Sequence, residues 1–79
     1  MKIYIVVIDD RHCDTDVKPF SDKEKAIEYA KEQVQSNARQ PEDIDEPELN
    51  ASMVKEGWVY YATYSCESDS VTVIERELI

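Results

Sequence analysis

The residue types that most often carry out chemistry in proteins lie at two places in this chain. His12 and Cys13 are adjacent and follow an apolar run, and Cys66 lies far along the sequence. Imidazole, thiolate and a neighbouring carboxylate can complete a tetrahedral zinc shell. The two cysteines could instead form a disulfide, or remain free thiols beside a surface histidine, and the spacing leaves these three interpretations open.

Rare residue types exclude several classes of active site. The chain contains one glycine, Gly57, and one histidine. It therefore has no glycine-rich phosphate loop, no dinucleotide fingerprint, no nucleophile elbow and no paired-histidine zinc motif. His12 has neighbouring carboxylates but no identifiable nucleophile or oxyanion loop. We therefore expect a protein that is not an enzyme and needs no cofactor.

Two carboxylates, Asp9 and Asp10, end the apolar run KIYIVVI. An apolar strand that ends in aspartate resembles the first strand of the small ferredoxin-like CRISPR-adaptation proteins, some of which are metal-dependent nucleases. The resemblance covers residues 1–10, and the basic surface and second helix of that family are missing here. A solvated strand end is the simpler interpretation of the two aspartates.

Acidity is the strongest compositional signal. The 79 residues carry eighteen acidic and nine basic side chains, a net charge of −9. Such a surface repels nucleic-acid phosphates and anionic membranes but attracts basic proteins. Residues 40–79 hold ten acidic and two basic side chains, whereas residues 1–39 hold eight and seven. We therefore expect a directed partner-binding surface in the second half, formed by Glu42, Asp43, Asp45, Glu46, Glu48, Glu67 and Asp69.

In size and charge the chain resembles small acidic phage-type inhibitors, including anti-CRISPR and other DNA-mimic proteins. The resemblance implies a non-enzymatic domain whose carboxylates imitate a phosphate backbone and compete for the groove of a basic, nucleic-acid-binding partner. One alternative is a metal- or small-ligand-binding domain that uses His12, Cys13 and Cys66. Another is a structural homodimer.

A small number of elements must position these residues. At this length we expect a single domain over residues 1–79. Residues 2–8 are β-forming throughout, and residues 58–66 and 71–78 predict a hairpin joined by the polar residues 67–70. The prediction is an α+β fold of order β-α-β-β, in which one helix packs on a single-layer sheet of three strands.

The expected helix begins at the sequence S-D-K-E, which predicts a capping box with Ser21 as N-cap and Glu24 reaching back to it. Apolar side chains at helical spacing form its inward stripe: Ala26, Ile27, Ala30, Val34 and Ala38. The preceding residues 9–20 are polar and contain Pro19, which predicts a loop whose Val17 and Phe20 turn back onto the core. Residues 48–55 fit a short helix or an extended segment.

The expected sheet has consequences for its edges and faces. If the strands over 2–8 and 58–66 run parallel, their carboxyl ends lie at the same edge of the sheet. His12, Cys13 and Cys66 would then lie close together at that edge. Both faces of the sheet are apolar, so either the acidic segment or another subunit covers the second face.

The longest apolar run, residues 3–8, is too short for a signal-peptide core or a membrane span. We expect a cytoplasmic protein with reduced thiols.

Overall fold

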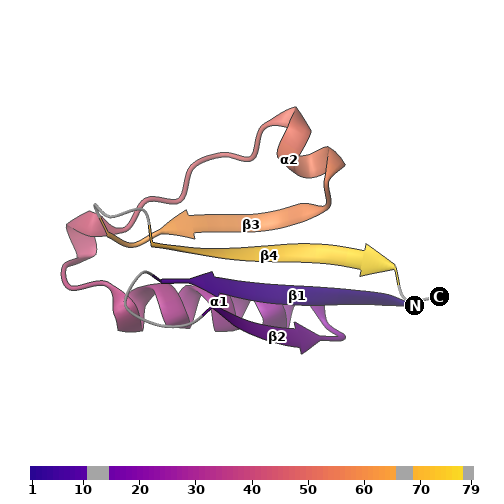
Figure 1. Ribbon diagram of the computed structural model, residues 1–79, viewed down its shortest axis with the longest axis horizontal. Coiled ribbons are helices and arrows are strands. Elements are labelled where there is room, and N and C mark those ends of the chain that lie inside the picture. Colours follow the sequence, from indigo (N-terminus) through magenta and orange to yellow (C-terminus); the bar gives the residue numbers. More distant parts are fainter. Residues whose placement is uncertain (11–14, 66–68, 78–79) are drawn as a thin grey trace.

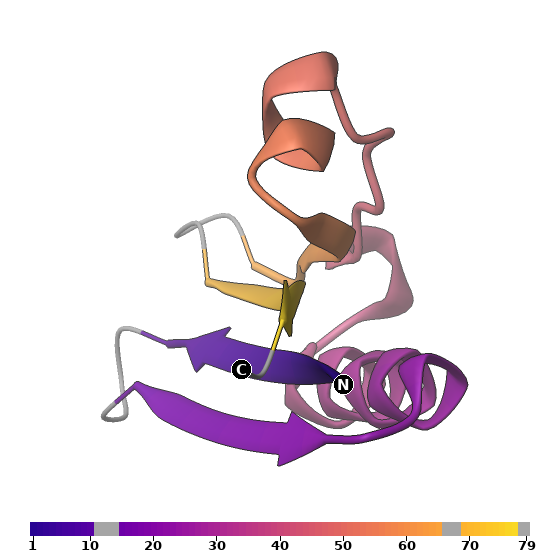
Figure 2. The same cartoon turned by 90° about the vertical axis from the view of Figure 1, so that its right-hand side faces the viewer.

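The computed structural model describes residues 1–10, 15–65 and 69–77 and shows a four-stranded antiparallel sheet with one long helix on one face (Figures 1 and 2). The order of the strands across the sheet is β2-β1-β4-β3. The fold is α+β, as predicted, with one strand more than the three expected. The elements are β1 (Lys2–Asp9), β2 (Asp16–Phe20), α1 (Lys23–Asn37), the 3-10 turn η1 (Pro41–Asp43), α2 (Ala51–Lys55), β3 (Trp58–Thr63) and β4 (Ser70–Glu77).

The additional strand is β2, and it corrects the prediction of a loop over residues 9–20. β2 pairs with β1 alone, at one edge of the sheet. Proline has no N–H to donate, so Pro19 is compatible with an edge strand but not with a central one. Phe20 packs against the core as predicted, but the prediction was wrong for Val17, which is 56% exposed. Val17 pairs with Val7, and both lie on the sheet face that points away from α1.

Helix α1 begins one residue later than the capping-box prediction. Its N-cap is Asp22, whose Oδ1 accepts hydrogen bonds from the backbone N–H groups of Glu24 (2.9 Å) and Lys25 (3.4 Å). The predicted inward stripe is confirmed, because Ala26, Ala30 and Val34 are buried. Two of these three side chains are methyl groups, which lets the helix approach the sheet closely.

The core lies between α1 and one face of the sheet. Alternate residues of β1 and β4 point toward the helix, because successive side chains of a strand point to opposite faces. Val6 is paired with Val73 and Ile8 with Val71, and all four side chains are buried. The other buried side chains of this layer are Ala62 and Tyr64.

The predicted hairpin is confirmed: β3 and β4 pair antiparallel, with a register shift between Trp58 and Tyr60. β1 and β3 run in the same direction because each is antiparallel to β4, which separates them. They are therefore not the adjacent parallel strands considered from the sequence, although their carboxyl ends do lie at the same edge of the sheet.

Of the two alternatives for residues 48–55, the structure shows the short helix, α2. Asn50 is its N-cap and accepts from the backbone N–H of Met53 (2.9 Å). After α2 the chain turns at Gly57, whose φ of 95° lies in the left-handed region that favours glycine. α2 lies beyond the outer edge of β3 rather than over the face opposite α1 (Figures 1 and 2). Neither helix in the described residues has the length and apolar run needed to cross a bilayer.

Candidate functional site

The acidic segment, residues 42–48, follows α1 and lies along the edge of the sheet formed by β3. It begins in η1, where the backbone N–H of Ile44 donates to Pro41 (3.2 Å). Asp45 then exchanges two backbone hydrogen bonds with Thr63, each 2.9 Å long. This bridge continues the hydrogen-bonding pattern of the sheet for one residue pair. The middle of the acidic segment is therefore fixed to the outer edge of β3.

Side chains on both sides of Asp45 strengthen this attachment. Ile44 is half-buried and packs against the core. The hydroxyl of Tyr60 donates a 2.5 Å hydrogen bond to Oε2 of Glu46. Burial raises the pKa of Tyr60 above its usual value, and the bond to Glu46 raises it further. The phenol is protonated and donates this bond at neutral pH, and three consecutive residues, Ile44, Asp45 and Glu46, hold the segment in place.

A cavity of about 230 Å³ lies behind this attachment, between α1, the acidic segment and β3. Val34 and Ile44 give it an apolar wall. Lys31 and Glu46 contribute opposite charges to its rim, and Nζ of Lys31 is 6.0 Å from the centre of the Tyr60 ring. Because the rim carries both charges, it favours neither an anionic nor a cationic ligand. We therefore describe the cavity as the space behind the attached segment and not as a ligand site.

The five carboxylates of the acidic segment are exposed and contain the highest concentration of like charge in the chain. None of them forms an ion pair with a residue that the structure describes. An extended chain rises about 3.3 Å per residue, so five charges over seven residues are on average at most about 5 Å apart. A single nucleic-acid strand carries one charge per about 3.4 Å. The predicted residues brought together here are Glu42, Asp43, Asp45, Glu46 and Glu48.

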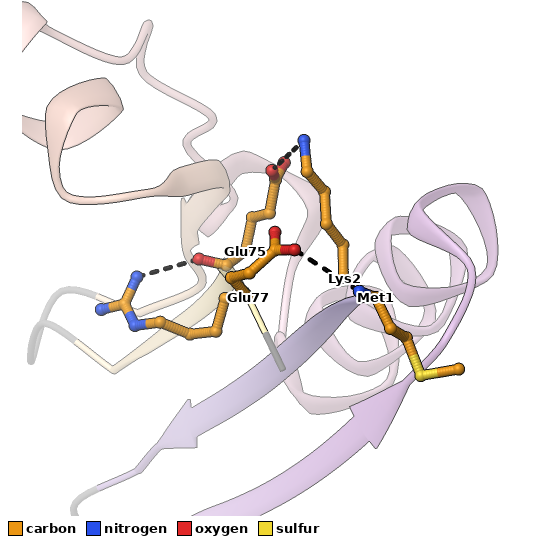
Figure 3. A network of polar contacts seen from close by, with 5 residues as sticks. Met1, Lys2, Glu75 and Glu77 are labelled. Carbon is orange, nitrogen blue, oxygen red and sulfur yellow. Dashed lines mark hydrogen bonds and ion pairs between the residues drawn. The ribbon is translucent and has the colours of Figure 1, made fainter. Parts of the chain in front are cut away.

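The acidic side chains of β4 differ, because basic groups pair with them (Figure 3). Nζ of Lys2 lies 3.0 Å from Oε1 of Glu75, and the N-terminal ammonium of Met1 lies 3.4 Å from Oε1 of Glu77. The hydrogen bond and the negative charge of Glu75 raise the pKa of Lys2. These pairs offset two negative charges locally. The unpaired acidity of the second half is therefore more concentrated in the acidic segment than the sequence indicated.

Asp69 does not belong to the exposed surface that the sequence predicted. It is 3% exposed and accepts a 2.9 Å hydrogen bond from the hydroxyl of Ser65. Its carbonyl oxygen also accepts from the backbone N–H of Tyr64 (3.0 Å). These bonds join Asp69 to the residues that directly follow β3, and its buried carboxylate is not part of the exposed acidic surface. Glu67, the other hairpin residue of the predicted surface, lies outside the described residues.

The structure describes part of the end of the sheet at which the sequence indicated a possible metal site. The hydroxyl of Tyr64 donates a 2.6 Å hydrogen bond to Oδ2 of Asp10, which joins the ends of β3 and β1. His12, Cys13 and Cys66 lie outside the described residues, so zinc binding and a disulfide there stay predictions. Among residues 1–10, 15–65 and 69–77, no group of three or more histidine, cysteine, aspartate or glutamate side chains could hold a metal ion.

Comparison with known proteins gave no matching family model, no matching curated protein and no matching solved structure.

Sequence reasoning missed the role of Tyr60 in the candidate site. The aromatic residues of 58–64 indicated a strand, and strand alternation places Tyr60 on one face of the sheet. Alternation carries no information about which carboxylate lies within reach of the hydroxyl. The two backbone bonds from Asp45 to Thr63 have no signal in the sequence either, because backbone groups are common to all residues.

Proposed function

We propose that this chain is a non-enzymatic interaction domain whose acidic segment binds a basic protein partner. The partner that fits best is a nucleic-acid-binding protein, whose groove the carboxylates would occupy in place of phosphates. The attachment of the acidic segment to β3 through Asp45 and Tyr60 is the observation that carries the proposal. An acidic loop that served only solubility would need no such attachment.

Attachment favours binding because it reduces the entropy lost on association. A flexible loop loses about 0.5–1.5 kcal/mol for each rotamer-rich side chain that becomes ordered, and its backbone must be ordered as well. In this chain the backbone of Ile44 and Asp45 is already held by hydrogen bonds, the Ile44 side chain is half-buried, and the Glu46 side chain is held by Tyr60. Less of the free energy gained from electrostatic attraction to a basic groove is then offset by ordering of the segment, so the affinity is higher.

The charge distribution supports a protein partner over direct binding to nucleic acid. The net charge of −9 repels phosphates, and the acidic segment has a charge spacing similar to that of a phosphate backbone. A groove lined by lysine and arginine would therefore attract the acidic segment in the same way that it attracts its nucleic acid.

Displacement of a labelled DNA duplex or RNA from a panel of basic nucleic-acid-binding domains tests the proposal. We expect the chain to displace nucleic acid from at least one domain, and its affinity to fall as the salt concentration rises. Neutralisation of the exposed segment by Glu42→Gln, Asp43→Asn, Asp45→Asn and Glu48→Gln should weaken displacement at least about tenfold, which corresponds to about 1.4 kcal/mol.

A control variant distinguishes the effect of the acidic segment from the effect of the net charge. Four exposed acids elsewhere, neutralised together, change the net charge by the same amount: Asp16→Asn, Glu28→Gln, Glu32→Gln and Glu56→Gln. We expect this variant to retain most of its displacement activity. An equal loss in both variants would show that bulk charge alone matters, and no displacement from any domain would reject the proposed function.

A further inference from the structure

The face of the sheet that points away from α1 is a second surface, and the proposed function does not use it. We call it the open face. Figure 2 shows α1 on the opposite side of the sheet and α2 beyond β3, so among the described residues no helix lies on the open face. Its centre is formed by half-buried apolar side chains, Ile5, Val7, Trp58, Tyr61 and Ile74, around the buried Thr72.

The two charged residues that the described strands place on the open face lie at its opposite ends. Asp9 is the last residue of β1, and Arg76 is paired with Ile3 at the other end of that strand. Nη1 of Arg76 donates to the carbonyl oxygens of Glu56 (2.7 Å) and Glu75 (2.9 Å). A guanidinium has five N–H donors, so those on Nε and Nη2 can serve another acceptor.

We propose that the open face binds a second copy of this chain, with the strands of the two sheets running in opposite directions. Consider a two-fold axis that lies in the interface between the two sheets and is perpendicular to the strands. It reverses the direction of the strands and places Asp9 of each copy beside Arg76 of the second copy. A two-fold axis parallel to the strands would instead place Asp9 beside Asp9. The charges are therefore complementary in one of the two symmetric arrangements. The proposal depends on the open face and not on the acidic segment.

The same axis keeps equivalent strands above one another, as in aligned packing of two sheets. Ile5 of each copy then packs near Val7 of the second copy, and Trp58 near Tyr61. The β3 edges of both copies lie on the same side of the dimer, with the two Asp45–Thr63 attachments at opposite ends of the strands, so both acidic segments remain exposed on that side. A dimer of this kind would present a doubled acidic surface to a basic partner.

The size of the open face sets the expected strength of association. Four strands about 4.8 Å apart, each contributing about 20 Å, cover about 400 Å². Each partner of a standard stable interface buries about 800 Å², so we expect a weak dimer with a dissociation constant above the micromolar range. Repulsion between two chains of charge −9 opposes the association and is screened by salt.

Sedimentation equilibrium from about 10 µM to about 1 mM, at low and high salt, tests the proposal. We expect a monomer–dimer equilibrium whose dimer fraction rises with salt, the opposite of the salt dependence expected for a basic partner. Two exposed valines provide a matched pair of variants: Val17 on the open face is 56% exposed, and Val54 on α2 is 58% exposed. Val17→Lys should weaken the dimer at least about tenfold, and Val54→Lys should leave it unchanged.

A second pair of variants tests the orientation. Asp9→Lys and Asp16→Lys change the net charge equally, but Asp16 is paired with Ile8 on the side of the sheet that faces α1. Asp9→Lys should weaken the dimer several-fold although it reduces the overall repulsion, whereas Asp16→Lys should not weaken it. A monomer at about 1 mM in both salt conditions, or equal effects within either pair, would overturn the proposal. In the case of a monomer, the open face would be available to a different protein and not to a second copy.

Discussion

The hydroxyl of Tyr60 on β3 lies 2.5 Å from Oε2 of Glu46, fourteen residues earlier in the chain. Tyr60→Phe should lower the free energy of unfolding at pH 7 by about 0.5–1.5 kcal/mol, the usual net value of one hydrogen bond. Tyr61→Phe, on the opposite face of the same strand, is the control, because its hydroxyl does not bond Glu46. Urea denaturation of the three proteins measures the difference.

The same tyrosine gives a prediction of pH dependence. The folded state raises the pKa of Tyr60 above the ordinary value of 10.0, so above that pH the unfolded chain loses this proton while the folded chain keeps it. The free energy of unfolding of the wild type therefore falls as the pH rises through this range. Tyr60→Phe lacks this contribution, so the stability difference between wild type and variant should decrease above pH 10.0. A difference that stays constant up to the alkaline limit of folding would contradict it.

The observed N-cap of α1 gives a second comparison of variants. Asp22→Ala removes the acceptor of the N–H groups of Glu24 and Lys25 and should lower the free energy of unfolding by about 1 kcal/mol. Ser21→Ala, one residue earlier, should change it by less than about 0.5 kcal/mol. Chemical denaturation at neutral pH measures both. The reverse order of effects would place the cap at Ser21.

Gly57 is expected to be intolerant of substitution for two reasons. Its φ is 95°, and a Cβ there would lie 2.7 Å from the carbonyl oxygen of Glu75 and 2.6 Å from Nη1 of Arg76. Gly57→Ala should therefore cost about 1–3 kcal/mol. Asparagine tolerates positive φ but has the same Cβ, so Gly57→Asn should remain clearly destabilised. Wild-type stability in the asparagine variant would show that the close approach is unimportant.

The buried methyl groups of α1 predict a sensitivity to larger side chains. Ala30 is fully buried against the sheet, so Ala30→Leu should destabilise the protein by about 1–3 kcal/mol through overpacking. Ser36→Leu introduces the same side chain at an exposed position of the same helix and should have a small effect. Thermal unfolding of both variants, followed by circular dichroism, compares them. Equal melting temperatures would show that α1 does not pack closely.

The elements with strong local patterns could be predicted from the sequence. The apolar run of β1, the inward stripe of α1 and the β3–β4 hairpin all follow from periodicity and β propensity. β2 could not be predicted in this way, because it is short, polar and contains Pro19. Its strand conformation comes from pairing with β1, which is a tertiary effect.

The candidate site divides in a similar way. The clustering of acids over 42–48 is visible in the sequence, as is their excess over basic residues. The burial of Asp69 and the pairing of Glu75 with Lys2 are not visible, because they depend on which strands are neighbours. A difference of one residue in the helix cap has a local cause: Ser21 and Asp22 are both good N-cap residues, and the sequence does not show which is used.

The strand order has a consequence for how the protein is made. β4, the last strand described, lies between β1 and β3 and pairs with both. A ribosome-bound chain that has been synthesised only as far as residue 69 lacks this strand, and β1 and β3 then have no shared neighbour. We therefore expect the sheet to assemble only after residues 70–77 have left the exit tunnel, and until then the apolar β1 strand has no β4 with which to pair.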